Sequence, residues 1–178
     1  MKKKVLSILL ALALCLSLLP TAALADETGG TGASGEAAQM PAYSGGSGTK
    51  DDPWLISTVE DLKTLAETIN SGAAAAYDAE SDGAGNYHGF YFKQTADLEL
   101  SSITNWVPIG YSLDEGYYFA GQYDGDGYTI ANATSNGQRD SEGYATAGIF
   151  GWVLLGSVEN LRVDRTNFTA TGVNNGGW

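Results

Sequence analysis

The sequence predicts an all-β fold with one amphipathic helix near its beginning, and three observations carry this prediction. From Phe90 onward, short runs of β-branched and aromatic residues alternate with glycine-rich turns. The chain contains 24 glycines but only 4 prolines, a mixture that suits many tight turns. Leu98, Ile130 and Leu161 recur at intervals of 32 and 31 residues. This rhythm favours a solenoid, while a sandwich and a barrel remain open.

Residues 1–25 have the features of a secretory signal peptide. Three lysines follow the initiator Met, an apolar run extends from Val5 to Leu19, and Ala23-Leu24-Ala25 supplies small residues for cleavage after Ala25. The run is shorter than the roughly 20 apolar residues of a membrane-spanning helix. Cys15 lies in this segment and is the only cysteine of the chain. The mature protein is therefore expected to have neither disulfides nor a cysteine nucleophile.

The chain is acidic, with a formal net charge of −12. Cleavage after Ala25 would remove three lysines and no acidic residue, making the mature chain more negative still. Such a chain is repelled by phosphate backbones and by anionic lipid surfaces. We therefore expect no nucleic-acid partner and no membrane insertion after signal cleavage.

Two further segments follow the signal peptide. Residues 26–48 are rich in glycine, alanine and serine and lack apolar periodicity, so we expect a flexible linker. Residues 49–178 have the length of one domain.

One helix is predicted from about residue 58 to residue 70. Ser57 is the expected N-cap, with Glu60 completing a capping box, and Gly72 is expected to end the helix. The apolar residues at helical spacing are Val59, Leu62, Leu65, Ala66 and Ile69. After it, residues 73–89 read as a polar surface loop. His88, the single histidine of the chain, is expected to be an exposed residue of that loop.

Strand-like runs fill the remaining chain. They are residues 52–56, 90–100, 106–110, 117–119, 128–130, 149–153, 158–163 and 167–170. Within the second run, Tyr91, Lys93 and Thr95 alternate with Phe90, Phe92 and Gln94.

Several segments in order resemble the N-terminal part of GLUG-motif secreted bacterial β-helix proteins. They include NWVPIG (105–110), FAGQYDGDGYTI (119–130), AGIFGWV (147–153) and VENLRV (158–163). The resemblance implies a right-handed parallel β-helix, or solenoid, capped by the helix at its N-terminal end. It also implies a cell-surface setting and longer chains. Because Gly176-Gly177-Trp178 looks like the start of another strand, we expect the domain to be truncated at its C-terminus or covered there by another molecule.

The DGDG segment, residues 124–127, has two aspartates that could bind a metal ion or a sugar, or could only form a turn. An EF-hand calcium loop needs further oxygen ligands at fixed positions, and none follows Asp126. Asp-Gly pairs form turns, so a turn is the preferred interpretation. A glycosidase needs two carboxyl groups across a sugar-binding groove. Two candidate pairs are Asp124 with Asp126 and Asp97 with Glu99, but neither pair has a supporting motif.

Other candidates are basic or aromatic. Polysaccharide lyases with the β-helix fold use calcium and a basic residue, which makes Arg162 and Arg165 candidates in or beside a strand. Arg162 alternates with Leu161 and Val163, so it is expected to face solvent. Trp and Tyr rings can stack on sugars, although in strands they more often pack inside. The aromatic candidates are Trp106, Tyr117, Tyr118 and Trp152.

The sequence therefore predicts a secreted or cell-surface structural or adhesive module, with extracellular polysaccharide or host glycan as the expected ligand class. The alternative is the N-terminal part of a polysaccharide lyase or glycoside hydrolase. No catalytic residue, metal ligand or cofactor is predicted, and the residues that would bind a ligand are not identified.

Overall fold

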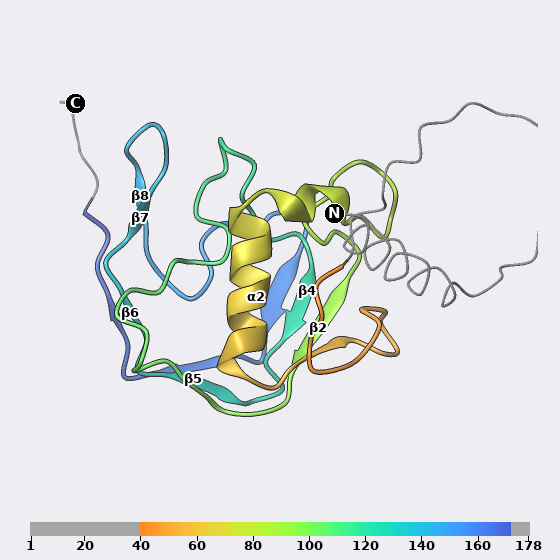
Figure 1. Cartoon of the computed structure of the whole chain (residues 1–178), viewed down its shortest axis with the longest axis horizontal. Coiled ribbons are helices and arrows are strands. Elements are labelled where there is room, and N and C mark those ends of the chain that lie inside the picture. The colour runs from red at the N-terminus through yellow and green to blue at the C-terminus, as the bar shows by residue number, and fades with distance from the viewer. Residues whose placement is uncertain (1–39, 172–178) are drawn as a thin grey trace, which may run out of the picture. The chain divides into compact units, whose positions relative to one another are not determined.

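The computed structural model describes residues 40–171. The predicted signal peptide, most of the predicted linker and the Gly176–Trp178 segment lie outside the described residues. The elements in chain order are β1 (Trp54–Ile56), α2 (Val59–Asn70), the 3-10 helix η1 (Ala73–Ala76), β2 (Tyr91–Gln94), β3 (Leu98–Glu99), β4 (Gln122–Asp124), β5 (Thr129–Ala131), β6 (Thr134–Ser135), β7 (Gln138–Arg139), β8 (Ala145–Thr146), β9 (Ser157–Glu159), β10 (Arg162–Asp164) and β11 (Asn167–Phe168). One α-helix and many short strands confirm the all-β prediction at this level (Figure 1).

Most of the strand pairing is parallel. Sheet A has the order β1-β2-β4-β9, sheet B has the order β10-β5-β3, and β11 pairs with β6 in a third sheet. The described chain visits these three sheets in the same order twice in full, as β4-β5-β6 and then as β9-β10-β11. Only the short hairpin β7-β8 is antiparallel among the named strands.

Equivalent side chains stack from strand to strand in register. In sheet A, Trp54 pairs with Phe92, Phe92 with Tyr123, and Tyr123 with Val158. The first three side chains of this column are buried. Since successive strand residues point to opposite faces, the neighbours Tyr91 and Lys93 face outward and are partly exposed.

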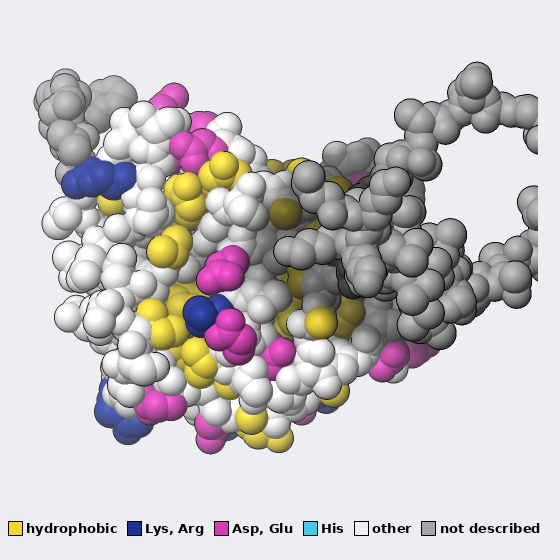
Figure 2. All heavy atoms as spheres, in the orientation of Figure 1, with side chains coloured by type: hydrophobic (Ala, Val, Ile, Leu, Met, Phe, Trp, Pro, Cys, Tyr) yellow, Lys and Arg dark blue, Asp and Glu magenta, His cyan; other side chains and the backbone are white. Residues whose placement is uncertain are grey.

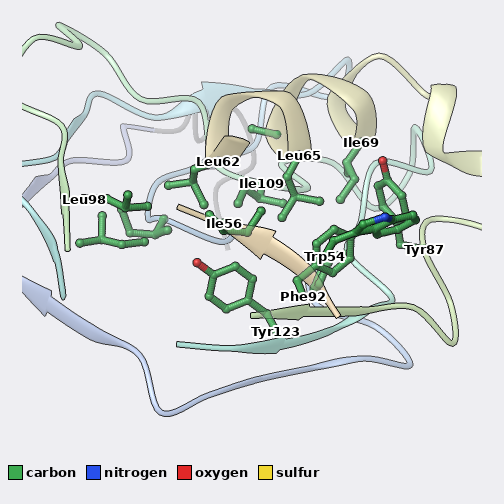
Figure 3. Close-up of a cluster of buried hydrophobic side chains, with 14 of the residues drawn as sticks. Trp54, Ile56, Leu62, Leu65, Ile69, Tyr87, Phe92, Leu98, Ile109 and Tyr123 are labelled. Carbon is green, nitrogen blue, oxygen red and sulfur yellow. The ribbon is translucent and has the colours of Figure 1, made fainter. Parts of the chain in front are cut away.

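Helix α2 covers this core with its apolar face. Figure 3 shows Leu62, Leu65 and Ile69 pointing from the helix toward Ile56 and Ile109, and all five are fully buried. Burying one such aliphatic side chain contributes about 1.5–3 kcal/mol. The helix prediction is confirmed in position.

The predicted cap of α2 is wrong by one residue. Thr58 is the N-cap and Asp61 completes the capping box, in place of Ser57 and Glu60. The Asp61 carboxylate is buried and also accepts a hydrogen bond from Ser44 Oγ at 2.7 Å. The contact with Ser44 favours the capping box of Thr58 and Asp61 over the overlapping one of Ser57 and Glu60. Beyond the helix, Gly72 has a φ of 78°, which fits its predicted role at the end.

The end of the predicted linker is part of the ordered domain. Ser44 N and Gly45 O are hydrogen-bonded to Leu55, which covers the outer edge of β1. The Tyr43 ring packs 5.3 Å from Trp54, and its hydroxyl is hydrogen-bonded to Tyr87 at 2.9 Å. The prediction of a linker extending to Gly48 is therefore wrong from about Tyr43 onward, because one aromatic anchor ties this glycine-rich segment to the core.

The segment 73–89 is also more buried than predicted. The alanines form η1, and Ala74, Tyr77 and Tyr87 are buried against the core. The rings of Tyr77 and Tyr87 stack 5.2 Å apart. Only the middle of the segment, residues 79–83, is exposed throughout.

Several predicted strands differ in detail. Ile130 pairs with Leu98 as the rhythm predicted, but its other partner is Val163 rather than Leu161. The predicted strand 158–163 breaks into β9 and β10 because Asn160 turns the chain with a φ of 53°. The runs 106–110, 117–119 and 149–153 form isolated bridges only, whereas β4 was not predicted.

The two ends of the stacked strands differ. At the end where the described chain begins, α2 and the segment near Tyr43 cover the core. At the other end, strands β9, β10 and β11 have no neighbour among the described residues on their outer edges. Side chains there are exposed, with Val163 at 45% and Phe168 at 38%. Within residues 40–171, one end is thus sealed and the other presents apolar surface.

Candidate functional site

The outer face of sheet A carries two rows of polar and aromatic side chains. Because the register is parallel, side chains of one row lie about 4.8 Å apart from strand to strand. One row consists of Lys93, Asp124 and Glu159, and the other consists of Tyr91, Gln122 and Ser157. The Ser157 hydroxyl donates to Gln122 Oε1 at 2.6 Å, which orders the second row.

These rows form one side of a groove, which we call the sheet A groove. Its volume is about 420 Å³, in the range of ligand-binding clefts. The residues that line it are Lys50, Asp51, Pro53, Tyr91, Phe92, Lys93, Gln122, Asp124 and Glu159. The groove combines hydrogen-bond donors, acceptors and an aromatic ring along one strand face.

The DGDG segment makes a turn at the edge of this groove, as predicted. Asp126 and Gly127 have φ values of 48° and 78°, and Asp126 N donates to Asp124 Oδ1 at 2.9 Å. The Asp126 carboxylate forms an ion pair with Lys93 Nζ at 3.1 Å. Asn160 Nδ2 donates to Asp124 Oδ1 at 2.9 Å. The segment therefore turns the chain and also fixes two charges of the groove.

The charges in the groove are set by these contacts. The hydrogen bond from Asn160, together with the Asp126 backbone N–H and the nearby Lys93 ammonium, lowers the pKa of Asp124. The hydrogen bond and charge of Asp126 raise the pKa of Lys93. Asp124 is thus ionised and Lys93 is protonated at neutral pH. Asp124 accepts hydrogen bonds under these conditions and is not poised to donate a proton.

The second acidic pair lies on sheet B and is engaged locally. Asp97 Oδ1 accepts from Thr129 N at 2.7 Å, and Glu99 accepts from Asn132 Nδ2 at 2.8 Å. The Asn132 side chain is the first cause of the lowered pKa of Glu99. These carboxylates tie neighbouring strands together. Both also line a shallow hollow of about 250 Å³, together with Arg165.

The two candidate arginines, Arg162 and Arg165, lie at the open end of the stacked strands. Arg162 is exposed in β10, as predicted. Arg165 Nε donates to Asn132 Oδ1 at 3.2 Å, and its Nη1 forms an ion pair with Asp164 at 3.0 Å. Neither arginine lines the sheet A groove.

The predicted aromatic candidates separate into buried and exposed residues. Trp106 is buried, and its Nε1 donates to Ile149 O at 3.0 Å, so it belongs to the core. Tyr117 and Tyr118 are both half-buried. Trp152 is 48% exposed, away from the sheet A groove. Tyr91 and Phe92 are the aromatic residues that line that groove, and Phe92 is buried. Tyr91 was expected only as a residue of a strand.

A second hollow, of about 240 Å³, lies between α2 and the segment around Trp106. It is lined mainly by apolar surface of Ile103, Trp106 and Val107, with Lys63 and Glu67 at its rim. Figure 2 shows the face that carries α2, where small hydrophobic groups lie between acidic side chains and basic ones are few. This hollow offers few polar groups, so the sheet A groove is the better candidate site.

His88 is not the exposed loop residue that the sequence predicted. Its side chain is 19% exposed, and Nδ1 lies 3.2 Å from Asp82 Oδ1 and 3.8 Å from Asp78 Oδ1. No spacing signal in the sequence marks this group, because the loop between Asp78 and His88 is folded back by glycines and by turn contacts.

Two known proteins show partial similarity to this chain. Halomucin of Haloquadratum walsbyi is 28% identical over 133 residues, covering 70% of this chain and 1% of that protein. A putative Gly-rich membrane protein of Evansella cellulosilytica is 29% identical over 141 residues, covering 76% of this chain and 14% of that protein. The chain thus spans a small fraction of each relative. No family model matches it, and no solved structure matches it.

Proposed function

We propose that residues 49–171 are the helix-capped start of a right-handed parallel β-helix of the GLUG-motif type. In this proposal the module is secreted or displayed at the cell surface, where its role is structural or adhesive. The sheet A groove binds an extended extracellular polysaccharide. The carrying observation is the parallel register of sheets A and B, in which equivalent residues are 31 to 38 positions apart.

The register supports a solenoid because consecutive strands of each sheet belong to consecutive passes of the chain. A sandwich built from hairpins would instead pair neighbouring strands antiparallel. Stacking of this kind buries inward side chains on the next pass and leaves a regular outer face for display. The handedness follows from the general preference for right-handed crossovers between parallel strands.

The groove supports a carbohydrate ligand through its chemistry. Tyr91 offers a ring face, while Gln122, Asp124 and Glu159 offer acceptors or donors for hydroxyl groups. The rows continue across three strands, so a polymer lying across the strands would make repeated shallow contacts. The ionised state of Asp124 favours hydrogen bonding to neutral sugar hydroxyls.

The extracellular setting has two supports. The N-terminal sequence has signal-peptide features, and the two similar proteins are named as a halomucin and a membrane protein. Among residues 40–171, the structure contains no helix long and apolar enough to cross a membrane. An extracellular module exposed to polysaccharides fits these supports.

A glycan array probed with the full mature chain tests the binding proposal. We expect retention on one class of extended polysaccharide, with at least tenfold weaker binding for Tyr91→Ala and for Gln122→Ala. Tyr144→Ala is the matched control, because Tyr144 is 67% exposed and lies outside the groove. Equal binding by all variants would contradict the groove assignment.

The alternative, an enzyme of the lyase or hydrolase class, gives a different result in the same samples. The bound polysaccharide would then show new reducing ends or unsaturated ends over time. Binding without product supports the adhesive function. If product forms with the wild-type chain and is lost in Asp124→Asn, the enzyme function replaces the adhesive function.

A further inference from the structure

A group of three potential metal ligands lies outside the sheet A groove. It consists of His88, the single histidine of the chain, together with Asp78 and Asp82. One ligand atom from each of the three residues lies within 4.8 Å of the other two. We call this group the Asp-Asp-His cluster.

Two of the three residues are fixed by the fold. Asp78 and His88 face one another in a parallel β-bridge, and Ala79 N donates to His88 O at 2.8 Å. Their neighbours Tyr77 and Tyr87 are buried and paired by a backbone hydrogen bond of 2.9 Å. The cluster therefore rests on the stacked tyrosines at the edge of the core.

The Asp78 carboxylate is held in place by backbone donors. Its Oδ1 accepts from Glu80 N and Ser81 N at 3.1 and 3.0 Å, and its Oδ2 accepts from Gly83 N at 2.7 Å. Burial opposes its ionisation, but these hydrogen bonds prevail and the pKa of Asp78 is lowered. Ligating carboxylates are commonly oriented by such outer hydrogen bonds.

We propose that Asp78 Oδ1, Asp82 Oδ1 and His88 Nδ1 bind one divalent transition-metal ion of the zinc class. Tetrahedral zinc bonds of about 2.0–2.1 Å place neighbouring ligand atoms about 3.3 Å apart. The distances from His88 Nδ1 to the two carboxylate oxygens, 3.2 and 3.8 Å, bracket that value. A water molecule completes the coordination.

The donor set selects the class of ion. An imidazole nitrogen with two carboxylates suits zinc and its neighbours, whereas calcium and magnesium prefer oxygen ligands alone. An ion can reach the cluster from solvent, because the Asp82 side chain is 53% exposed. The Asp78 side chain, in contrast, is only 12% exposed. An ion here would replace the His88–Asp82 hydrogen bond and join the loop tip to the bridge at its base. The site goes beyond the proposed glycan binding and does not depend on it.

Calorimetric titration of the chelator-treated full chain with zinc chloride tests the proposal. We expect one site, with at least tenfold weaker binding for His88→Gln and for Asp82→Asn. Asp114→Asn is the control, because Asp114 is an exposed carboxylate outside the cluster. No binding by the wild-type chain, or wild-type affinity in His88→Gln, would overturn the site.

Nitrogen-15 NMR of the imidazole gives a readout that needs no variant. Since the chain has one histidine, its ring signals are unambiguous. Zinc should shift the Nδ1 resonance and fix the proton on Nε2. Calcium chloride should leave both ring signals in place. Ring signals unchanged at saturating zinc, or equal responses to calcium and zinc, would refute the assignment.

Discussion

The side chain of Asn70 takes the place of a β-strand partner for Gly110. Asn70 Nδ2 donates to Pro108 O at 2.9 Å, and Gly110 N donates to Asn70 Oδ1 at 3.0 Å. On its other edge, Ile109 pairs with the segment 149–151 through two backbone hydrogen bonds. The last residue of α2 thus completes the hydrogen bonding of a segment whose edge would otherwise be open.

Asn70→Ala should lower the free energy of unfolding by about 1–3 kcal/mol, because it leaves one backbone donor and one acceptor without partners. Alanine has the higher helix propensity, so any loss must come from these two bonds. Urea unfolding of Asn70→Ala beside Asn136→Ala, which changes an exposed asparagine, measures the effect. Equal stability of the two variants would contradict the pairing role.

Asp61→Asn should produce a pH-dependent loss of stability. Burial opposes ionisation of Asp61, but hydrogen bonds from Ser44, Thr58 and Ser57 prevail and lower its pKa from 3.8. A carboxyl group with a depressed folded-state pKa stabilises the fold above its unfolded-state pKa, and this contribution disappears as the pH falls through the folded-state value.

The wild-type chain should therefore exceed Asp61→Asn by about 1–3 kcal/mol above about pH 5, with the gap closing below about pH 4. Chemical unfolding at a series of pH values measures this gap. A gap that stays constant down to pH 2 would show that the Asp61 charge contributes nothing.

Gly125 and Gly127 should respond differently to alanine. A Cβ atom at Gly125 would lie 2.6 Å from Leu161 Cα, whereas at Gly127 it would meet nothing within 4 Å. Gly125→Ala should force the turn between β9 and β10 away from β4, at a cost of about 2–3 kcal/mol. Gly127→Ala should cost about 1–2 kcal/mol, from its positive φ alone. Thermal unfolding of both variants checks the order, and the reverse order would contradict the close packing.

Tyr123→Phe should destabilise the core through Gln94. The Tyr123 hydroxyl donates to Gln94 Oε1 at 3.1 Å, and both side chains are fully buried. Removing the hydroxyl leaves the buried Gln94 oxygen without this donor, which should cost about 1–2 kcal/mol. Urea unfolding measures the loss, with Tyr144→Phe as the exposed control. A stability equal to wild type would mean that another donor replaces the hydroxyl.

Local patterns in the sequence predicted the positions of the helix and strands better than the contacts between distant residues. The apolar stripe from Leu62 to Ile69 placed the helix, and the β-type run that contains Tyr91 to Gln94 placed a strand. The DGDG turn was predictable because Asp and Gly favour its geometry. These features depend on neighbours within a few residues.

Features set by distant contacts were not predictable. The choice of Asp61 over Glu60 as the capping partner depends on Ser44, which the sequence placed in a flexible linker. The stacking of Val163 on Ile130 depends on the turn at Asn160. Likewise, the position of His88 beside two aspartates follows from how its loop folds back onto the core.

The contrast between the sealed and open ends gives folding a direction. The chain emerges from its N-terminus, so α2 and the first strands can collapse on one another before β9 to β11 are available. Each later strand then meets a ready template and closes a loop of similar length, without waiting for a distant partner. Assembly by successive addition exposes one growing front at a time, which limits the opportunities for mispairing during folding.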